Sequence, residues 1–334
     1  MSPLSSIILL DQTCRSDENQ FMAVILLTGA AGFVAGHLAA FLSSEGHDVY
    51  GTDREAVLPN DKWKGFLTAE LSDLEHLRYY LHDLCPDYIF HFASVLKADR
   101  PQAYYQTNVV GMIGLMEAVT SAQIKPLVLV ASSSAVYGAG YAKKPISENF
   151  KLRPASHYAA SKAAQEIVAI RYHREDRIPV IIMRTFNLLG PGLSRDLACS
   201  SFARQIARAE AGHSSKTISV GDLSAKRDFL DVRDAVRAYW LLAQRGSPGQ
   251  CYNVCSGRAT LMQDCLDILL SLSPCKLSLT QDPIRLQKND VSIQTGSCTR
   301  LRRLTGWRLK ISIRQSLEGL LEFWRERVRL NLET

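Results

Sequence analysis

A tyrosine and a lysine lie four residues apart in the segment Tyr158-Ala-Ala-Ser-Lys162. On a helix, this spacing puts both side chains on one face, about one turn apart. A free tyrosine has a pKa of about 10 and is a poor acid–base group near neutral pH. A neighbouring ammonium group favours the phenolate and lowers that pKa. The pair therefore predicts a site at which a proton is transferred.

Three hydroxyl groups precede this pair in the chain. Ser132-Ser-Ser134 follows an apolar run at 126–131 that is typical of a buried strand. A hydroxyl at the end of that strand is able to hydrogen-bond a substrate oxygen beside Tyr158. The spacing Tyr-x-x-x-Lys alone occurs by chance in many helices, whereas serine, tyrosine and lysine in this order form a more specific pattern.

A glycine-rich turn, Thr28-Gly-Ala-Ala-Gly-Phe-Val-Ala-Gly36, lies upstream of both groups. Gly29 and Gly32 allow a tight turn in which backbone N–H groups approach a pyrophosphate at a helix N-terminus. Asp53 ends the next predicted strand, where an acid accepts hydrogen bonds from ribose hydroxyls. These features predict a dinucleotide site that favours NAD(H). NADP(H) is the alternative, because Arg54 would attract a 2′-phosphate.

The elements that must position these groups alternate along the chain. Short apolar runs predict buried strands, and the stretches between them predict helices. Strands are expected at 23–27, 47–50, 88–92, 126–131 and 178–183, and helices near 33–44, 72–83, 103–122 and 155–174. This order predicts an α/β fold with a doubly wound parallel sheet of the Rossmann type.

The predicted organisation of the chain has three parts. Residues 1–21 are expected to form a disordered extension, and residues 22–184 the dinucleotide-binding domain. Residues 185–334 are expected to form mainly a smaller mixed α/β domain that binds substrate, with the chain able to cross between the two. The last helix is predicted to bury one amphipathic face. That face carries Leu317, Leu320, Leu321, Trp324 and Val328.

The composition excludes several classes of protein. A chain of 334 residues with 46% hydrophobic and 22% charged residues is typical of a globular protein. It has no apolar run of about 18 residues, so no membrane span is predicted. The net charge of +6 is small and suits an anionic small molecule better than nucleic acid. The eight cysteines show no zinc spacing, which predicts no metal site and free thiols in a cytoplasmic protein.

With these motifs in this order, residues 22–330 resemble the extended short-chain dehydrogenase/reductase family of nucleotide-sugar epimerases, dehydratases and reductases. The resemblance implies that Ser133 hydrogen-bonds the sugar hydroxyl or ketone and that Tyr158 is the acid–base group. It also implies that Lys162 holds the nicotinamide ribose.

Ser133 is chosen among the three serines because the family's serine or threonine lies four residues before the tyrosine of a Tyr-Gly pair. That tyrosine is Tyr137 here. The flanking Ser132 and Ser134 are expected to be structural, with Ser134 also at the edge of the substrate site.

The expected cofactor contacts come mostly from the ends of the first strands. They are Gly29, Gly32, Phe33, Val34, Asp53, Arg54, Glu70, Leu71, Phe92, Ala93, Tyr158 and Lys162. Glu70 is expected to accept a hydrogen bond from the adenine amino group, and an exposed loop acid is the alternative interpretation.

The second half of the chain is most similar to the GDP-4-keto-6-deoxymannose reductases of this family, in segments 184–192, 201–206, 227–234 and 252–257. The resemblance implies that Asn187 and Arg227 contact the sugar diphosphate. A guanidinium suits that role because it binds phosphate bidentately and stays charged. A further diphosphate arginine of the family is Gln287 here, and Arg285 is the candidate substitute.

Two reactions remain in view. Family members that dehydrate or decarboxylate sugars carry acids at the positions of Ser134 and Ala135, and alanine is unable to act as the second acid–base group. The favoured expectation is NAD(P)H-dependent reduction of a 4-keto nucleotide sugar, GDP-linked by preference, in a homodimer. The alternative is an NAD-dependent nucleotide-sugar 4-epimerase, ahead of a dehydratase or a non-enzymatic NAD(P) sensor.

Overall fold

A computed structural model of the chain describes residues 22–56, 61–138, 144–283 and 293–332. The expected extension at 1–21, the candidate Arg285 and Gln287 lie outside the described residues.

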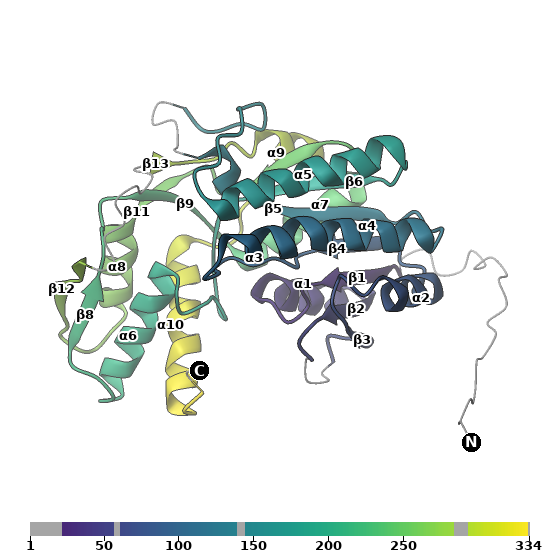
Figure 1. Ribbon diagram of the computed structural model, residues 1–334. Coiled ribbons are helices and arrows are strands. Elements are labelled where there is room, and N and C mark those ends of the chain that lie inside the picture. Colours follow the sequence, from purple (N-terminus) through teal and green to yellow (C-terminus); the bar gives the residue numbers. More distant parts are fainter. Residues whose placement is uncertain (1–21, 57–60, 139–143, 284–292, 333–334) are drawn as a thin grey trace, which may run out of the picture.

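The larger region of the molecule is built on a seven-stranded parallel sheet (Figure 1). Its strands are β1 (Val24–Thr28), β2 (Asp48–Asp53), β3 (Gly65–Thr68), β4 (Tyr88–His91), β5 (Leu127–Ser133), β6 (Val180–Thr185) and β10 (Cys251–Val254). Their order is β10-β6-β5-β4-β1-β2-β3, and every neighbouring pair is parallel. This confirms the predicted doubly wound sheet. The strand order reverses between β1 and β4, and open α/β sheets bind ligands at such a point, beyond the carboxyl ends of the strands.

Helices cover both faces of this sheet. One face is covered by α1 (Phe33–Ser44), α7 (Val232–Arg245) and α9 (Thr299–Thr305). The other is covered by α2 (Leu74–Leu84), α4 (Gly111–Ser121) and α5 (His157–Glu175). The stretch expected as one helix at 103–122 consists of α3 (Pro101–Tyr105), the π-helical turn η1 (Gln106–Val110) and α4. No described helix is both long enough and apolar enough to cross a membrane.

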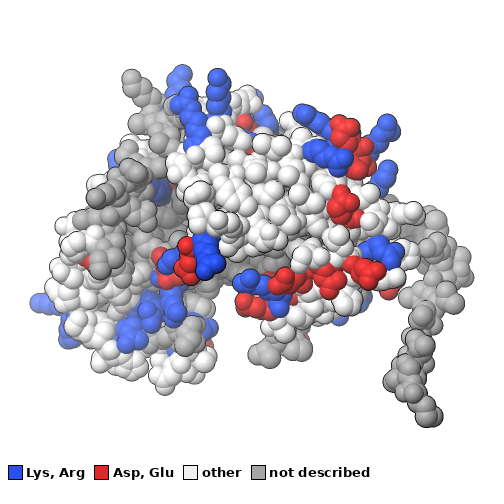
Figure 2. All heavy atoms as spheres, in the orientation of Figure 1, with Lys and Arg blue, Asp and Glu red and all other residues white. Residues whose placement is uncertain are grey.

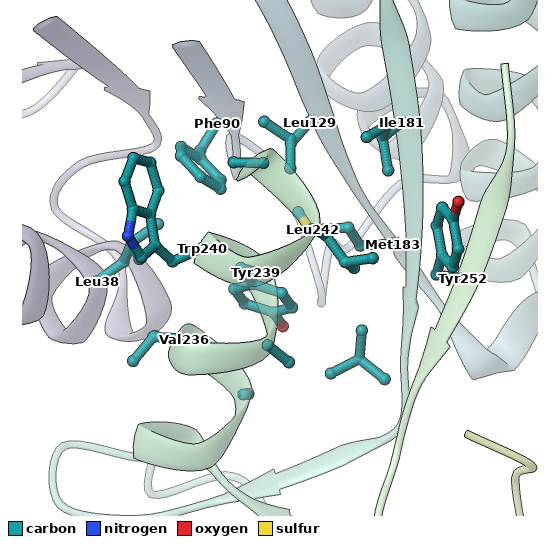
Figure 3. Packing of buried hydrophobic residues seen from close by; sticks show 14 of the residues in the cluster. Leu38, Phe90, Leu129, Ile181, Met183, Val236, Tyr239, Trp240, Leu242 and Tyr252 are labelled. Carbon is teal, nitrogen blue, oxygen red and sulfur yellow. The ribbon is translucent and has the colours of Figure 1, made fainter. Parts of the chain in front are cut away.

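Alternate residues of the strands supply two separate cores. In β1, Ile25 and Leu27 pack toward α1 and α7, whereas Leu26 packs toward α2 and α4. Successive side chains of a strand point to opposite faces, so a strand covered on both sides is apolar throughout. Figure 3 shows α7 presenting Val236, Tyr239, Trp240 and Leu242 to Phe90, Leu129, Ile181 and Met183 of the sheet.

The smaller region, on the left of Figure 1, has its own core. Its helices are α6 (Ala198–Glu210), α8 (Met262–Ser271) and α10 (Ile313–Arg329), and its strands are β7 (Asn187–Leu189), β8 (Thr217–Val220), β9 (Lys226–Asp231), β11 (Ala259–Leu261), β12 (Ser278–Gln281) and β13 (Ile293–Gln294). Strand β9 is central: it pairs with β7 and β13 in parallel and with β11 antiparallel. The predicted apolar face of the last helix is buried in this core.

The chain crosses between the two regions more than once. After β9, helix α7 returns to the large sheet and β10 adds a strand beside β6. The 3-10 turn η2 (Ser134–Tyr137) follows β5 and faces the smaller region, where Ser134 meets β13. These crossings bring residues far apart in the sequence to the same side of the sheet.

Candidate active site

A cavity of about 830 Å³ lies beyond the carboxyl ends of β1, β4, β5 and β6, and residues of the smaller region line its other side. Figure 2 shows the molecular face on which the two regions meet, with Lys and Arg side chains on the smaller region and also along the upper edge of the larger one. The cavity lies at the place that the reversal of strand order indicates.

Most of the predicted site residues come together in the lining of this cavity. They are Gly29, Gly32, Phe33, Val34, Phe92, Ser133, Ser134, Tyr158, Lys162, Asn187 and Arg227. The other described candidates, Asp53, Arg54, Glu70, Leu71 and Ala93, lie outside the lining.

The glycine turn has the geometry of a dinucleotide cradle. Gly29 has a φ of +68°, and a Cβ atom there would lie 2.5 Å from the backbone nitrogen of Ala93. Only glycine fits this close approach of the turn to the loop after β4. Gly32 is the N-cap of α1 and no described side chain caps it, so N–H groups of the first turn are available to a pyrophosphate. These residues fit the phosphates of NAD(H) or NADP(H).

Asp53 braces the same turn. Its Oδ2 atom accepts a hydrogen bond of 3.0 Å from the Ala31 backbone N–H group, and the side chain is half-buried. The neighbouring Arg54 is exposed and lies 3.8 Å from the Glu55 carboxylate. The Asp53 carboxylate is thus held beside the glycine turn, whereas the neighbouring Arg54 guanidinium forms an ion pair with Glu55.

We expect NAD(H) to bind more tightly than NADP(H), and Asp53→Asn to narrow that difference by about tenfold, or roughly 1.4 kcal/mol. The asparagine keeps an oxygen that accepts the Ala31 N–H bond and removes only the charge that repels a 2′-phosphate. Calorimetric titration of both cofactors against both proteins measures the difference. A wild-type preference for NADPH would overturn this assignment.

Glu70 and Leu71 lie on the loop that leads into α2. Glu70 is exposed and accepts a hydrogen bond of 3.3 Å from the Ser72 hydroxyl, which corresponds to the alternative interpretation of an exposed loop acid. Leu71 packs closely against α4, because a Cβ atom at Gly114 would lie 2.1 Å from the Leu71 carbonyl oxygen. Contact of either residue with the cofactor stays a prediction.

The predicted serine, tyrosine and lysine project from two adjacent elements. Ser133 is the last residue of β5, and its Oγ atom accepts a hydrogen bond of 3.1 Å from the Ala135 N–H group. Tyr158 and Lys162 lie on the first two turns of α5, whose N-terminus is capped by the Ser156 side chain. A hydrogen bond joins Ser133 to the Tyr158 side chain. The C-terminal end of β5 and the N-terminal end of α5 therefore meet, and this brings the three groups together.

The protonation of Tyr158 differs from the sequence-based expectation. Burial raises the pKa of Tyr158, and the hydrogen bond from Ser133 acts in the opposite direction. Lys162 is not among the causes of the shifted Tyr158 pKa, so the lowering that the sequence predicted is not found. The Lys162 Nζ atom donates to the Ala131 carbonyl oxygen at 2.7 Å and to Gln165 Oε1 at 3.0 Å. The phenol therefore carries its proton at neutral pH, in the form that a proton donor needs.

Gln294 is a cavity residue that the sequence motifs did not indicate. Its Oε1 atom accepts a hydrogen bond of 3.1 Å from the Ser134 hydroxyl, and its Nε2 atom donates to the Ser134 carbonyl oxygen at 3.1 Å. It also lies opposite Arg227 in the register of β13 and β9. Gln294 thus connects Ser134, which follows Ser133, to strand β9, which carries Arg227, the residue predicted to bind the substrate diphosphate. Strand β13 has two residues, too few for any periodicity in the sequence.

The comparison with protein families shows the family to which the chain belongs. Residues 25–255 match the NAD dependent epimerase/dehydratase family. The chain belongs to this family of nicotinamide-dependent enzymes, and its fold is that of the extended short-chain dehydrogenases/reductases.

Individual relatives narrow the resemblance. The chain is 34% identical over 311 residues to GDP-6-deoxy-D-mannose reductase of Pseudomonas aeruginosa, covering 91% of this chain and 98% of that protein. It is 28% identical over 315 residues to UDP-glucose 4-epimerase of Mycolicibacterium smegmatis, covering 90% and 98%. Among solved structures, RMD from Pseudomonas aeruginosa complexed with NADPH is 32% identical with a TM-score of 0.78, covering 91% of this chain and 99% of that one.

Proposed function

We propose that this protein reduces the 4-keto group of a nucleotide sugar, with GDP-4-keto-6-deoxymannose as the favoured substrate. The observation that carries the proposal is one cavity lined by the glycine turn, by Ser133, Tyr158 and Lys162, and by Arg227. The 34% identity to a GDP-6-deoxy-D-mannose reductase supports the choice of the GDP-linked sugar.

In this mechanism the chain supplies the proton and the orientation. Bound NAD(P)H supplies the hydride for C4. The Tyr158 phenol donates its proton to the ketone oxygen as the carbon–oxygen double bond becomes a single bond. The Ser133 hydroxyl donates a hydrogen bond to the same oxygen and stabilises the negative charge that develops there. The Lys162 ammonium binds the nicotinamide ribose beside them.

Substrate contacts come from the smaller region. Asn187 and Arg227 line the cavity on β7 and β9. The Asn187 amide donates to the Asp228 carbonyl oxygen at 3.1 Å, which fixes its orientation. We propose that both residues bind the diphosphate of the nucleotide sugar, a role for which guanidinium geometry is suited.

Ser133→Ala is expected to lower turnover by about 100-fold, which is typical of losing one hydrogen-bond donor to a developing oxyanion. Tyr158 remains as the proton donor, so the loss should be smaller than that from changing Tyr158. The measurement is kcat with saturating cofactor and 4-keto sugar. Ser132→Ala is unsuitable as a control because Ser132 bonds to buried Glu166, so Ser194→Ala, an exposed serine of the lining, is the matched variant. A Ser133→Ala protein with wild-type kcat would contradict the assigned role.

A nucleotide-sugar 4-epimerase is the second candidate, and the 28% identity to UDP-glucose 4-epimerase supports it. The same three residues would then oxidise and re-reduce C4 without net use of cofactor. A dehydratase is less favoured because Ala135, at the position of the family's acid, lines the cavity with a methyl group.

The quaternary structure that we propose is a homodimer formed through the stretch 103–122, which holds α3, η1 and α4, and through α5. Apolar side chains on this surface are exposed, with Val110 at 43%, Ile113 at 38% and Ile167 at 68%. Burial of such side chains against a second copy would remove apolar area from water.

Thermal-shift measurements with GDP- and UDP-linked sugars test the substrate assignment. A ligand that binds only the folded state raises the melting temperature. We expect the GDP-linked sugars to give the larger rise, and an Arg227→Met variant to lose most of it. A larger rise with UDP-glucose than with any GDP-linked sugar would instead favour the epimerase.

A further inference from the structure

A buried ion pair that the proposed mechanism does not use lies behind the catalytic end of β5. Arg184 of β6 donates from Nε and Nη2 to the carboxylate of Glu166 on α5, at 2.9 and 2.7 Å. The two side chains are 9% and 6% exposed. Burying both charges has a large desolvation cost, so a buried pair is weak as a stabilising element by itself. Its position beside the active site is the informative feature.

The Glu166 carboxylate connects the two elements that carry the catalytic groups. Ser132, directly before Ser133, donates to Glu166 Oε1 at 2.5 Å. Glu166 also follows Lys162 by one helical turn on α5. One side chain therefore ties the end of β5 to α5 at the place from which Ser133 and Lys162 project.

Arg184 is in turn held from several sides. It pairs with Ser132 in the β5–β6 register. Its Nη1 atom donates to the Tyr137 hydroxyl at 3.0 Å and to the Glu148 carbonyl oxygen at 3.1 Å. The Tyr137 hydroxyl donates onward to Asn253 Oδ1 at 2.7 Å. The guanidinium is thus fixed by the turn η2 and by β10 before it orients Glu166.

The charges around Lys162 come from three elements. Tyr158 and Glu166 lie on its own helix, His91 lies on β4 and Arg184 lies on β6. Burial lowers the pKa of Lys162 to about 7, and the Glu166 charge acts in the opposite direction. Burial also lowers the pKa of His91 to about 3, so this ring is neutral near pH 7. Among these residues around Lys162, Glu166 is the one that carries a negative charge.

We propose that Glu166, held by Arg184, is a positioning residue that aligns Ser133 with Lys162 and supplies the negative charge on which the Lys162 ammonium depends. The effect on turnover rests on the proposed function, whereas the effect on the charge of Lys162 does not.

The direct test is a pH titration of Lys162, followed by NMR with ¹³C at the lysine Cε atoms in the full-length chain. The Lys162 signal is assigned by its loss in Lys162→Met. In Glu166→Gln the ammonium loses its anion, so the midpoint should fall by about one pH unit or more. The pH above which turnover declines should move down with it. A midpoint that falls by less than about half a unit overturns the proposal.

Two further variants make the result specific. Glu210→Gln removes the carboxylate of the Glu210–Arg325 pair, 2.7 Å apart between α6 and α10 and outside the cavity lining. It should leave the Lys162 midpoint unchanged. If Glu166→Gln fails to fold because Arg184 is left unpaired, the double variant Glu166→Gln/Arg184→Met is compared with Arg184→Met alone, so that both proteins lack the guanidinium. Its Lys162 midpoint should lie about one pH unit or more below that of Arg184→Met, and a difference of less than about half a unit overturns the proposal.

The two proposals fail separately. A lowered Lys162 midpoint in a protein that turns over no 4-keto sugar rejects the proposed function and retains the role of Glu166. An unchanged midpoint in a confirmed reductase rejects the role of Glu166 alone.

Discussion

Tyr158→Phe is expected to lower turnover of the 4-keto sugar by about 100- to 10,000-fold, the usual cost of losing a general acid. Phenylalanine keeps the ring and its edge-to-face contact with Tyr104, at 6.4 Å between ring centroids. It removes the one group assigned to protonate the ketone oxygen. Steady-state kcat together with the dissociation constant of the cofactor measures the effect, and cofactor binding should survive.

A neighbouring phenol provides the control. Tyr105→Phe removes a hydroxyl that hydrogen-bonds His157 at 3.3 Å, outside the cavity lining, and should keep kcat close to that of the wild type. If Tyr158 only packs against the cofactor, the Phe variant will turn over its substrate at nearly the wild-type rate with an unchanged pH–rate profile. That result would end the assignment of Tyr158 as the acid.

Lys162→Met is expected to impair both turnover and cofactor binding, because the ammonium is assigned to the nicotinamide ribose of the cofactor that supplies the hydride. A hydrogen bond to a charged group contributes about 1.5–3 kcal/mol, so the cofactor dissociation constant should rise by roughly 10- to 150-fold. Fluorescence titration with NADH and NADPH measures this rise.

The fold of the Lys162→Met protein should be retained. Methionine is apolar and removes a buried charge, although the Ala131 carbonyl oxygen and Gln165 Oε1 each lose a donor. A melting curve by circular dichroism is the control. A folded variant with wild-type cofactor affinity would contradict the placement of Lys162 at the ribose.

The sheet and its main helices were predictable because their signals are local and periodic. The run at 23–27 is apolar at every position, as is typical of a strand covered on both faces. The last helix carries its buried residues at helical spacing. The tyrosine and lysine proposed as catalytic were likewise indicated by their spacing and by their place after the glycine turn, and Ser133 was chosen by the family resemblance.

The features that were not predicted depend on contacts between distant parts of the chain. The two hydrogen bonds between Ser134 and Gln294 span 160 residues and leave no local pattern. The Glu166–Arg184 pair becomes visible only when α5 packs on β5 and β6. The raised pKa of Tyr158 follows from burial, which the spacing to Lys162 does not reveal.

Reduction at C4 is tested most directly by supplying purified protein with GDP-4-keto-6-deoxymannose and with NADH or NADPH that carries deuterium at the transferable position. We predict one oxidised cofactor for each sugar reduced, and NMR of the product should place the deuterium on C4. If Tyr158→Phe shows neither cofactor oxidation nor deuterium on C4, the hydride transfer takes place in the cavity that Tyr158 lines. The contradicting result is a protein that retains bound NAD, interconverts C4 epimers of a nucleotide sugar and leaves the added cofactor unoxidised, because that behaviour defines the 4-epimerase.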